Sequence, residues 1–257
     1  MKNKFQIKKY RMLYLSVVIL VLSLCTSVVK AQNGNNDASF NTADYVSGQG
    51  ADKIIRVSAV QSDNKLIIAG SFLQYNGVGA AGLARLEMDG KLDETFNAGS
   101  GVDGVINAIA LQSNDKAIIA GSFTDYNGIA VNSIARINQD GSFDNTLNSG
   151  DGTNEAISQL VIQPNGKILI AGAFSTYNGD TVNGVVRLNR NGTRDNTFNA
   201  ILPDTLERIH QIALQPDGKI IVAGVTNMFD MYLYTLVRLN SDGTRDYSFN
   251  PTGRFTG

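Results

Sequence analysis

The stretch that decides the fold is LQSNDKAIIAGSF, residues 111–123. It recurs with small changes as VQSDNKLIIAGSF at 60–72, IQPNGKILIAGAF at 162–174 and LQPDGKIIVAGVT at 214–226. The glutamines of the four copies are 51, 51 and 52 residues apart. The chain is therefore one unit repeated four times, and a period of this length is typical of solenoids, propellers and open arrays.

The second unit serves to predict the strands. Residues 105–112, VINAIALQ, alternate in part between apolar and polar and predict a first strand. Residues 117–123 predict a second strand, apolar on both faces and therefore covered on both sides. The Ala-Gly pair near its end, 120–121, lets another backbone approach closely. A third strand is expected at 133–138, followed by a short fourth strand or strand-like return at 144–148.

Tight turns between these strands set the topology. Asn165-Gly166 and Asp217-Gly218 lie between the first and second strands of the last two units, and such pairs predict type I′ hairpins. Hairpins disfavour a β-solenoid, whose coils are parallel. An all-β fold follows, and about 50 residues with roughly four antiparallel strands are typical of one propeller blade. We expect a β-propeller built from four ~51-residue antiparallel blades.

The number of blades stays open, because two parts of the unit occur in different numbers. A short Asp-x-x-Phe/Leu-Asn segment occurs five times, whereas the Gln…Ala-Gly stretch occurs four times. The five copies are Asp37–Asn41, Asp93–Asn97, Asp144–Asn148, Asp195–Asn199 and Asp246–Asn250. The chain thus begins and ends part-way through a unit, so the four blades form a ring of their own, an incomplete ring or a fragment of a larger propeller. An uncovered blade face or sheet edge is expected to cause self-association.

The N-terminus has the features of a secretory signal peptide over residues 1–31. Five basic residues lie in 1–11, an apolar run spans 12–24, and Val29-Lys30-Ala31 supplies a small-x-small cleavage site. An uncleaved anchor is the alternative, although the run is shorter than the ~20 residues of a comfortable span. Residues 32–53 are predicted to form a link with a partial repeat, and 54–257 the propeller, with units at about 54–104, 105–155, 156–207 and 208–257.

Composition excludes several classes of function. Cleavage removes 6 of the 22 basic residues and none of the 23 acidic ones, which leaves a net charge of −7. This excess argues against nucleic acid as a partner. The only cysteine is Cys25, so the mature chain can form neither a disulfide nor a thiolate zinc site. We expect a secreted protein, extracellular or at the cell surface, with no membrane span after cleavage.

Several recurring elements together resemble the delta-60 repeat family. They are the Gln-Pro-Asp/Asn-Gly-Lys turn (163–167 and 215–219), the Ala-Gly-Ser-Phe strand end, and a tail whose fullest copy is Arg238–Asn250. The resemblance covers essentially the whole mature chain. It implies a β-propeller-like repeat of secreted bacterial proteins, with no general activity attached to the family.

Repeated polar residues are expected to be structural. An arginine recurs every 51 residues, at Arg85, Arg136, Arg187 and Arg238. We expect it to pair with the recurrent aspartate or with backbone carbonyls. His210 is the only histidine, and its counterparts Arg56, Asn107 and Ser158 share no chemistry, so neither a triad nor a histidine metal site is predicted.

Two further motifs can be interpreted either as ligand sites or as structural elements. Gly99–Gly104 matches G-x-G-x-x-G, but a strand is expected after it instead of the helix that a dinucleotide needs, so we interpret it as a link. Asn138-x-Asp140-Gly-x-x-Asp144 could offer oxygens to Ca²⁺, but too few ligands are present, and a turn that binds its own backbone is favoured. No cofactor is expected.

Function is predicted only by class. The favoured hypothesis is an exported, non-catalytic binding or interaction scaffold for a protein or carbohydrate at the cell surface. The alternatives are a structural or adhesin segment of a larger surface protein, and a propeller hydrolase or lyase. Recognition should break the repeat symmetry, which changes most at 227–234, where a loop is expected to replace the Tyr-Asn-Gly loop of the other units. The ligand-binding candidates are Met228, Phe229, Met231, Tyr232 and Tyr234. The alternative is that this segment packs under a neighbouring blade, because end repeats are atypical.

Overall fold

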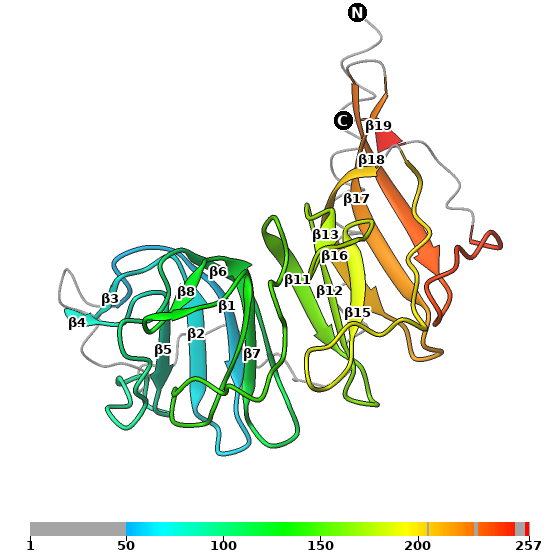
Figure 1. The fold of residues 1–257 in the computed structure, drawn as a ribbon. Helices are drawn as coiled ribbons and strands as arrows, with labels where there is room; N and C mark the ends of the chain where they lie inside the picture. Colours follow the sequence, from blue (N-terminus) through cyan, green and yellow to red (C-terminus); the bar gives the residue numbers. More distant parts are fainter. Residues whose placement is uncertain (1–49, 205, 229–230, 250–254, 257) are drawn as a thin grey trace, which may run out of the picture. The chain divides into compact units, whose positions relative to one another are not determined.

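The computed structural model describes residues 50–204, 206–228, 231–249 and 255–256. All of them belong to one compact unit of the chain, residues 38–257. The predicted signal peptide and nearly all of the predicted link lie outside the described residues. Within the described ranges no helix is long and apolar enough to cross a membrane. The secondary structure of these ranges consists of strands, bridges and turns, as predicted (Figure 1).

Each of the first three units forms a three-stranded antiparallel sheet with a central second strand. The orders are β1-β2-β5, β6-β7-β10 and β11-β12-β15. Their bounds are Ile55–Val60, Leu66–Gly70 and Leu83–Leu86; Val105–Leu111, Ala117–Ser122 and Ile134–Ile137; Ile157–Ile162, Ile168–Gly172 and Val185–Leu188. The fourth strand predicted at 144–148 was wrong. The return of the chain is limited to the bridge of Ile137 with Phe143 and the bond from the Asp144 amide to the Arg136 carbonyl at 2.8 Å, and a turn follows at 145–146.

The fourth unit is built differently. Its sheet has the order β16-β17-β18-β19, with bounds Leu206–Leu214, Ile220–Met228, Met231–Leu239 and Phe255–Thr256. β17 and β18 pair over their whole length, from Ile220–Leu239 to Met228–Met231 (Figure 1). The loop predicted at 227–234 was therefore wrong: Tyr232 and Tyr234, aromatic residues that favour strands, pair with Asn227 and Val225 and extend the hairpin instead.

The type I′ turns predicted at Asn165-Gly166 and Asp217-Gly218 were wrong. Gly166 has a positive φ, but Asn165 has not, and the Gly166 amide donates to the Gln163 carbonyl. This is a type I turn followed by one left-handed residue, and Pro164 suits its second position. The type I′ geometry, with positive φ at both central residues, lies instead in the Tyr-Asn-Gly segments, as at Asn127 (51°) and Gly128 (79°). These segments form the small hairpins β3-β4 (Gln74–Tyr75, Val78–Gly79), β8-β9 (Asp125–Tyr126, Ile129–Ala130) and β13-β14 (Thr176–Tyr177, Asp180–Thr181).

The hydrophobic core lies between consecutive units. Ile119 and Ala117 pack with Ile67 of the first unit, while the opposite face of the same strand packs with the third unit through Ile118 and Ile170. A third cluster joins the third and fourth units in the same way. The central strands β2, β7 and β12 are buried almost throughout, so the prediction of coverage on both faces is confirmed.

Candidate functional site

Every first strand carries a β-bulge at the same repeat position. The register of β6 with β7 passes from Ile106–Gly121 to Ala108–Ala120 and leaves Asn107 unpaired. The corresponding residues are Arg56 in β1, Ser158 in β11 and His210 in β16. A bulge frees its residue from the ladder and redirects the side chain, and bulges are frequent beside functional sites. We call Arg56, Asn107, Ser158 and His210 the bulge row.

The Ala-Gly pair explains why the bulge forms in every unit. A Cβ added at Gly121 would collide with the Val105 carbonyl oxygen and lie 3.0 Å from the Asn107 nitrogen. Equivalent collisions occur at Gly70 and Gly172 with the carbonyl just before the first strand, and at Gly224 with the Arg208 carbonyl of β16. The predicted close backbone approach is confirmed, and its partner is the bulged first strand.

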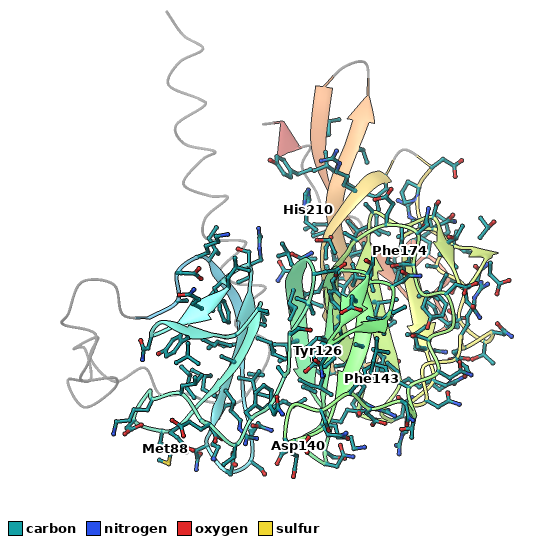
Figure 2. All side chains as sticks on the ribbon, turned by 60° about the vertical axis from the view of Figure 1, so that its left-hand side comes forward. Met88, Tyr126, Asp140, Phe143, Phe174 and His210 are labelled. Carbon is teal, nitrogen blue, oxygen red and sulfur yellow. The ribbon has the colours of Figure 1, made fainter. Side chains whose placement is uncertain are left out.

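Three members of the bulge row line a cavity of about 480 Å³, and we call it the bulge hollow. They are Arg56, Asn107 and Ser158, from three consecutive units whose first strands are in contact. The Asn107 Nδ2 donates to the Ile157 carbonyl at 3.0 Å and thus ties two units together at this point. Arg56 is exposed, and Asn107 and Ser158 are half-buried. His210 is exposed on β16 and does not line the cavity (Figure 2).

The hollow offers hydrogen bonds and one positive charge. Arg56 supplies a guanidinium, Ser158 a hydroxyl and Asn107 a side-chain amide. None of these three side chains is a general base near neutral pH. The chemistry that they can provide is recognition of polar or anionic groups.

A charge network recurs in each unit away from the hollow. In the second unit the Asp144 Oδ2 accepts from Lys116 Nζ and Arg136 Nε, both at 2.7 Å, and Oδ1 accepts from the Thr146 amide and hydroxyl at 2.9 and 2.6 Å. Burial acts to raise the pKa of Asp144, but the hydrogen bonds from Lys116, Thr146 and Arg136 outweigh it and hold the pKa far below its usual range. The aspartates at the same place in the other units are Asp93, Asp195 and Asp246. We call these four residues the network aspartates.

The same arginines also join successive units. Arg136 Nη1 donates to the Arg190 carbonyl at 3.0 Å, and the Asn148 amide donates to the Asn191 carbonyl at 2.6 Å. The other two joints repeat this pair of bonds, from Arg85 to Gln139 and Asn97 to Asp140, and from Arg187 to Ser241 and Asn199 to Asp242. The expected pairing of the arginine with aspartate and with backbone carbonyls is confirmed, and its role is structural.

The fourth unit lacks such a joint within the described residues. The Arg238 side chain is 20% exposed, against 8% for Arg85 and 10% for Arg187, and no carbonyl of a further unit accepts from it there. Ile221 is only half-buried, whereas its counterparts Ile118 and Leu169 are fully buried. Among the described residues, nothing covers the Ile221 face of β17 completely, in keeping with the expected open blade face.

The Asp-Gly turns are closed by their own hydrogen bonds. Asp140 Oδ1 accepts from the Ser142 amide at 3.0 Å and from its hydroxyl at 2.6 Å. The Tyr126 hydroxyl donates to the Gly141 carbonyl at 2.5 Å, and its ring lies 6.3 Å from that of Phe143 (Figure 2). The turn interpretation is confirmed. Across the described ranges, no group of three or more His, Cys, Asp or Glu could hold a metal ion.

The G-x-G-x-x-G string is an ordered link. Strand β6 follows it directly, as predicted, so the helix of a dinucleotide site is not formed. The Ser100 amide donates to Asn127 Oδ1 at 3.0 Å, and the Asn127 amide donates to the Gly101 carbonyl at 2.7 Å. The link at the end of the first unit thus holds the Tyr-Asn-Gly hairpin of the second unit.

The predicted ligand-binding residues lie at the far end of the last hairpin. Met228 and Met231 pair across it, Tyr232 and Tyr234 are part of β18, and Phe229 lies outside the described residues. Of the five side chains, only that of Tyr234 is described, and it is 49% exposed. Tyr234 is not among the residues that line the bulge hollow. Their role in binding stays a prediction.

Sequence reasoning missed the hollow, although one signal was present. His210 and its counterparts in the other units are chemically unrelated. This variation at one repeat position distinguishes the residues of the hollow from the repeated residues of the scaffold. Bulges are hard to see in a sequence, because a single extra residue leaves the apolar pattern on either side intact.

Comparison with known proteins confirms the repeat. A family model described as a domain of unknown function (DUF5122) β-propeller matches residues 61–96, 112–147, 163–198 and 215–249. The chain belongs to the DUF5122 β-propeller family. The resemblance to a propeller repeat is thereby confirmed, while the delta-60 name stays a prediction. Each DUF5122 match begins at the glutamine after the first strand, so β1, β6 and β11 lie outside the matched spans.

A solved structure is also similar to part of the chain. An X-ray structure described as that of a "putative gluconolactonase" matches with 12% sequence identity and a TM-score of 0.41. The match covers 73% of this chain, and the chain spans 60% of that structure. None of the curated proteins matches the DUF5122 chain.

Proposed function

We propose that this chain is an exported, non-catalytic β-propeller that binds a ligand at the cell surface or outside the cell, through the bulge hollow. One observation carries the proposal. The residues that hold the scaffold are repeated from unit to unit, whereas the bulge row holds Arg56, Asn107, Ser158 and His210. Identical units present identical surfaces, so selective recognition needs a place where they differ, and a rigid β scaffold suits this role.

Two further features support the class. The hollow is lined by hydrogen-bonding groups without a general base, which favours binding over hydrolysis or lyase chemistry. The basic, apolar and small-residue order of residues 1–31 favours export, and the net charge of −7 after cleavage argues against nucleic acid. A bacterial cell surface, the setting implied by the resemblance to delta-60 repeats, is consistent with both.

Binding is tested by making the hollow symmetric. Arg56→Asn with Ser158→Asn would give the first three units the same bulge residue, while the network and the core stay unchanged. We expect the mature chain, residues 32–257, to capture defined ligands on a glycan and protein array, and the symmetric variant to lose the strongest of them at an unchanged melting temperature. Arg245→Gln, a charge loss at the opposite sheet edge, is the matched control. Equal capture by all three proteins would refute binding at the hollow.

Export is tested separately on the full chain. Secreted protein should begin at Gln32 by N-terminal sequencing, and deletion of 1–31 should retain it inside the cell. Retention of the intact chain in the membrane fraction would favour the anchor instead.

A second candidate function is a structural segment of a larger surface assembly. The uncovered face of β17 and the unjoined Arg238 favour it, because every other unit buries these groups against its successor. We expect the mature chain to self-associate in sedimentation velocity, and Ile221→Lys to make it monomeric. A monodisperse monomer at high concentration would remove this candidate.

A further inference from the structure

We infer that the bulge hollow takes a sugar-sized ligand that carries a carboxylate, such as a uronic acid residue. The inference rests on the proposed function and names the chemistry that the hollow would recognise. Three observations support it: an uncommitted guanidinium, two oriented neutral polar side chains, and the volume of the cavity.

Arg56 is the charged group of the hollow. Within the described part of the chain it forms no ion pair, whereas Arg85, Arg136 and Arg187 are each bound to a network aspartate. The other two lining residues are neutral, so no carboxylate of the hollow itself neutralises the guanidinium. A guanidinium presents a planar pair of donors that matches a carboxylate, and such charge-assisted bonds are roughly twice as strong as neutral ones.

Asn107 and Ser158 can form hydrogen bonds with the neutral hydroxyl groups of a ligand. The amide nitrogen of Asn107 is engaged with the Ile157 carbonyl, which fixes the side chain and leaves Oδ1 as an acceptor. The Ser158 hydroxyl has no hydrogen-bond partner among the described residues, and it can both donate and accept. Both side chains are half-buried and held by bulged backbone, so little ordering is needed on binding.

The volume sets the size of the ligand. The hollow is wide open to solvent, so its volume of about 480 Å³ gives an upper bound on the size of the ligand. A lone inorganic anion would contact Arg56 and leave most of this volume to water. A hydroxylated ring with one carboxylate can reach Arg56 and the two neutral side chains together.

D-glucuronate and D-glucose test the inference, because they differ in a carboxylate against a hydroxymethyl group. We expect saturable binding of glucuronate to the mature chain with a dissociation constant on the order of 1 mM, as for small polar ligands. Glucose should bind about tenfold more weakly, and Arg56→Gln should weaken glucuronate by a similar factor. Arg56→Lys should restore part of the affinity, and Arg245→Gln should leave it unchanged. Titration by isothermal calorimetry gives all the constants, and amide shifts at Asn107 and Ser158 locate the ligand.

Three results would overturn the inference. They are no detectable binding at a glucuronate concentration about 20 times the expected dissociation constant, equal affinity for glucose and glucuronate, or an unchanged affinity of Arg56→Gln for glucuronate. The proposed function fails separately. If the array ligand depends on the bulge row but glucuronate does not bind, the hollow is a binding site for another class of ligand. If the symmetric variant captures the array ligands as well as the unaltered chain does, the proposed function itself is wrong.

Discussion

Asp144→Asn tests the charge network that repeats through the chain. Asp144 is 3% exposed, and its Oδ2 is shared by Arg136, 9% exposed, and Lys116, 31% exposed. The substitution keeps the shape and the Oδ1 acceptor for Thr146, but it turns an amide group toward two cations. Arg136 then remains buried without its counter-charge.

The cost can be estimated from the two ion pairs. Breaking a buried pair by removing one partner costs about 3–5 kcal/mol. The lysine contributes the smaller share, because its side chain is partly solvated and its pair is screened. Arg136 also retains its bond to the Arg190 carbonyl at 3.0 Å, which offsets part of the loss. We therefore expect a loss of about 3 kcal/mol in the free energy of unfolding.

Urea unfolding of the mature chain measures this loss. With an m-value of roughly 3 kcal/mol/M, the midpoint should fall by about 1 M. Asp140→Asn is the matched control, since the third unit already has Asn191 at that turn position and the amide oxygen can still accept from Ser142. Its effect should stay within about 0.5 kcal/mol. If Asp144→Asn costs under about 1 kcal/mol, or no more than the control, the network does not hold the fold as argued.

Four further outcomes are expected. The folded-state pKa of each network aspartate lies below its unfolded value of 3.8, so their contribution to stability is complete above that value and is lost as pH falls below about 4; urea midpoints that do not change between pH 5 and 3 would contradict this. Ile119→Ala should cost about 2–5 kcal/mol in urea, since Ile119 is fully buried, and a loss below about 0.5 kcal/mol would place it at the surface. Gly121→Ala should cost about 1–3 kcal/mol because the new Cβ meets the Val105 carbonyl, whereas Gly79→Ala, with open space around it, is the neutral control. Millimolar Ca²⁺ should leave the melting temperature unchanged; a rise abolished by Asp140→Ala with Asp242→Ala would assign calcium to these turns.

The repeat made most of the fold predictable. Four copies of one pattern identify the strands together, because an accidental apolar run in one unit is not repeated in the others. The same logic predicted the pairing of Arg136 with Asp144, which the structure shows at 2.7 Å. The bond from Arg136 to the Arg190 carbonyl of the next unit was predicted only as a bond to some backbone carbonyl. The sequence does not show how neighbouring blades are offset, so it could not identify which carbonyl accepts.

Turn geometry was not predictable from the Asn-Gly pair alone. Asn165-Gly166 and Asn127-Gly128 have the same two residues, yet only the second pair is type I′. Pro164 precedes the first pair, and its ring fixes its own φ near the value for the second position of a type I turn. The length of the loop, set by which residues the flanking strands pair, decides between the two types.

The bulge hollow shows what a repeat pattern conceals. Periodicity draws attention to residues that recur, and in this chain those residues build the scaffold. Gly121 and its counterparts admit the bulge, and Ile106, Ile157 and Ile209 fill the core beside it. The bulged residue between them has no partner in the ladder, so the fold does not dictate its side chain. Its identity can then be set by a ligand without a change in the blade. A propeller of this construction can acquire a new specificity at the three positions that line the hollow while the network aspartates, the joints and the core remain as they are.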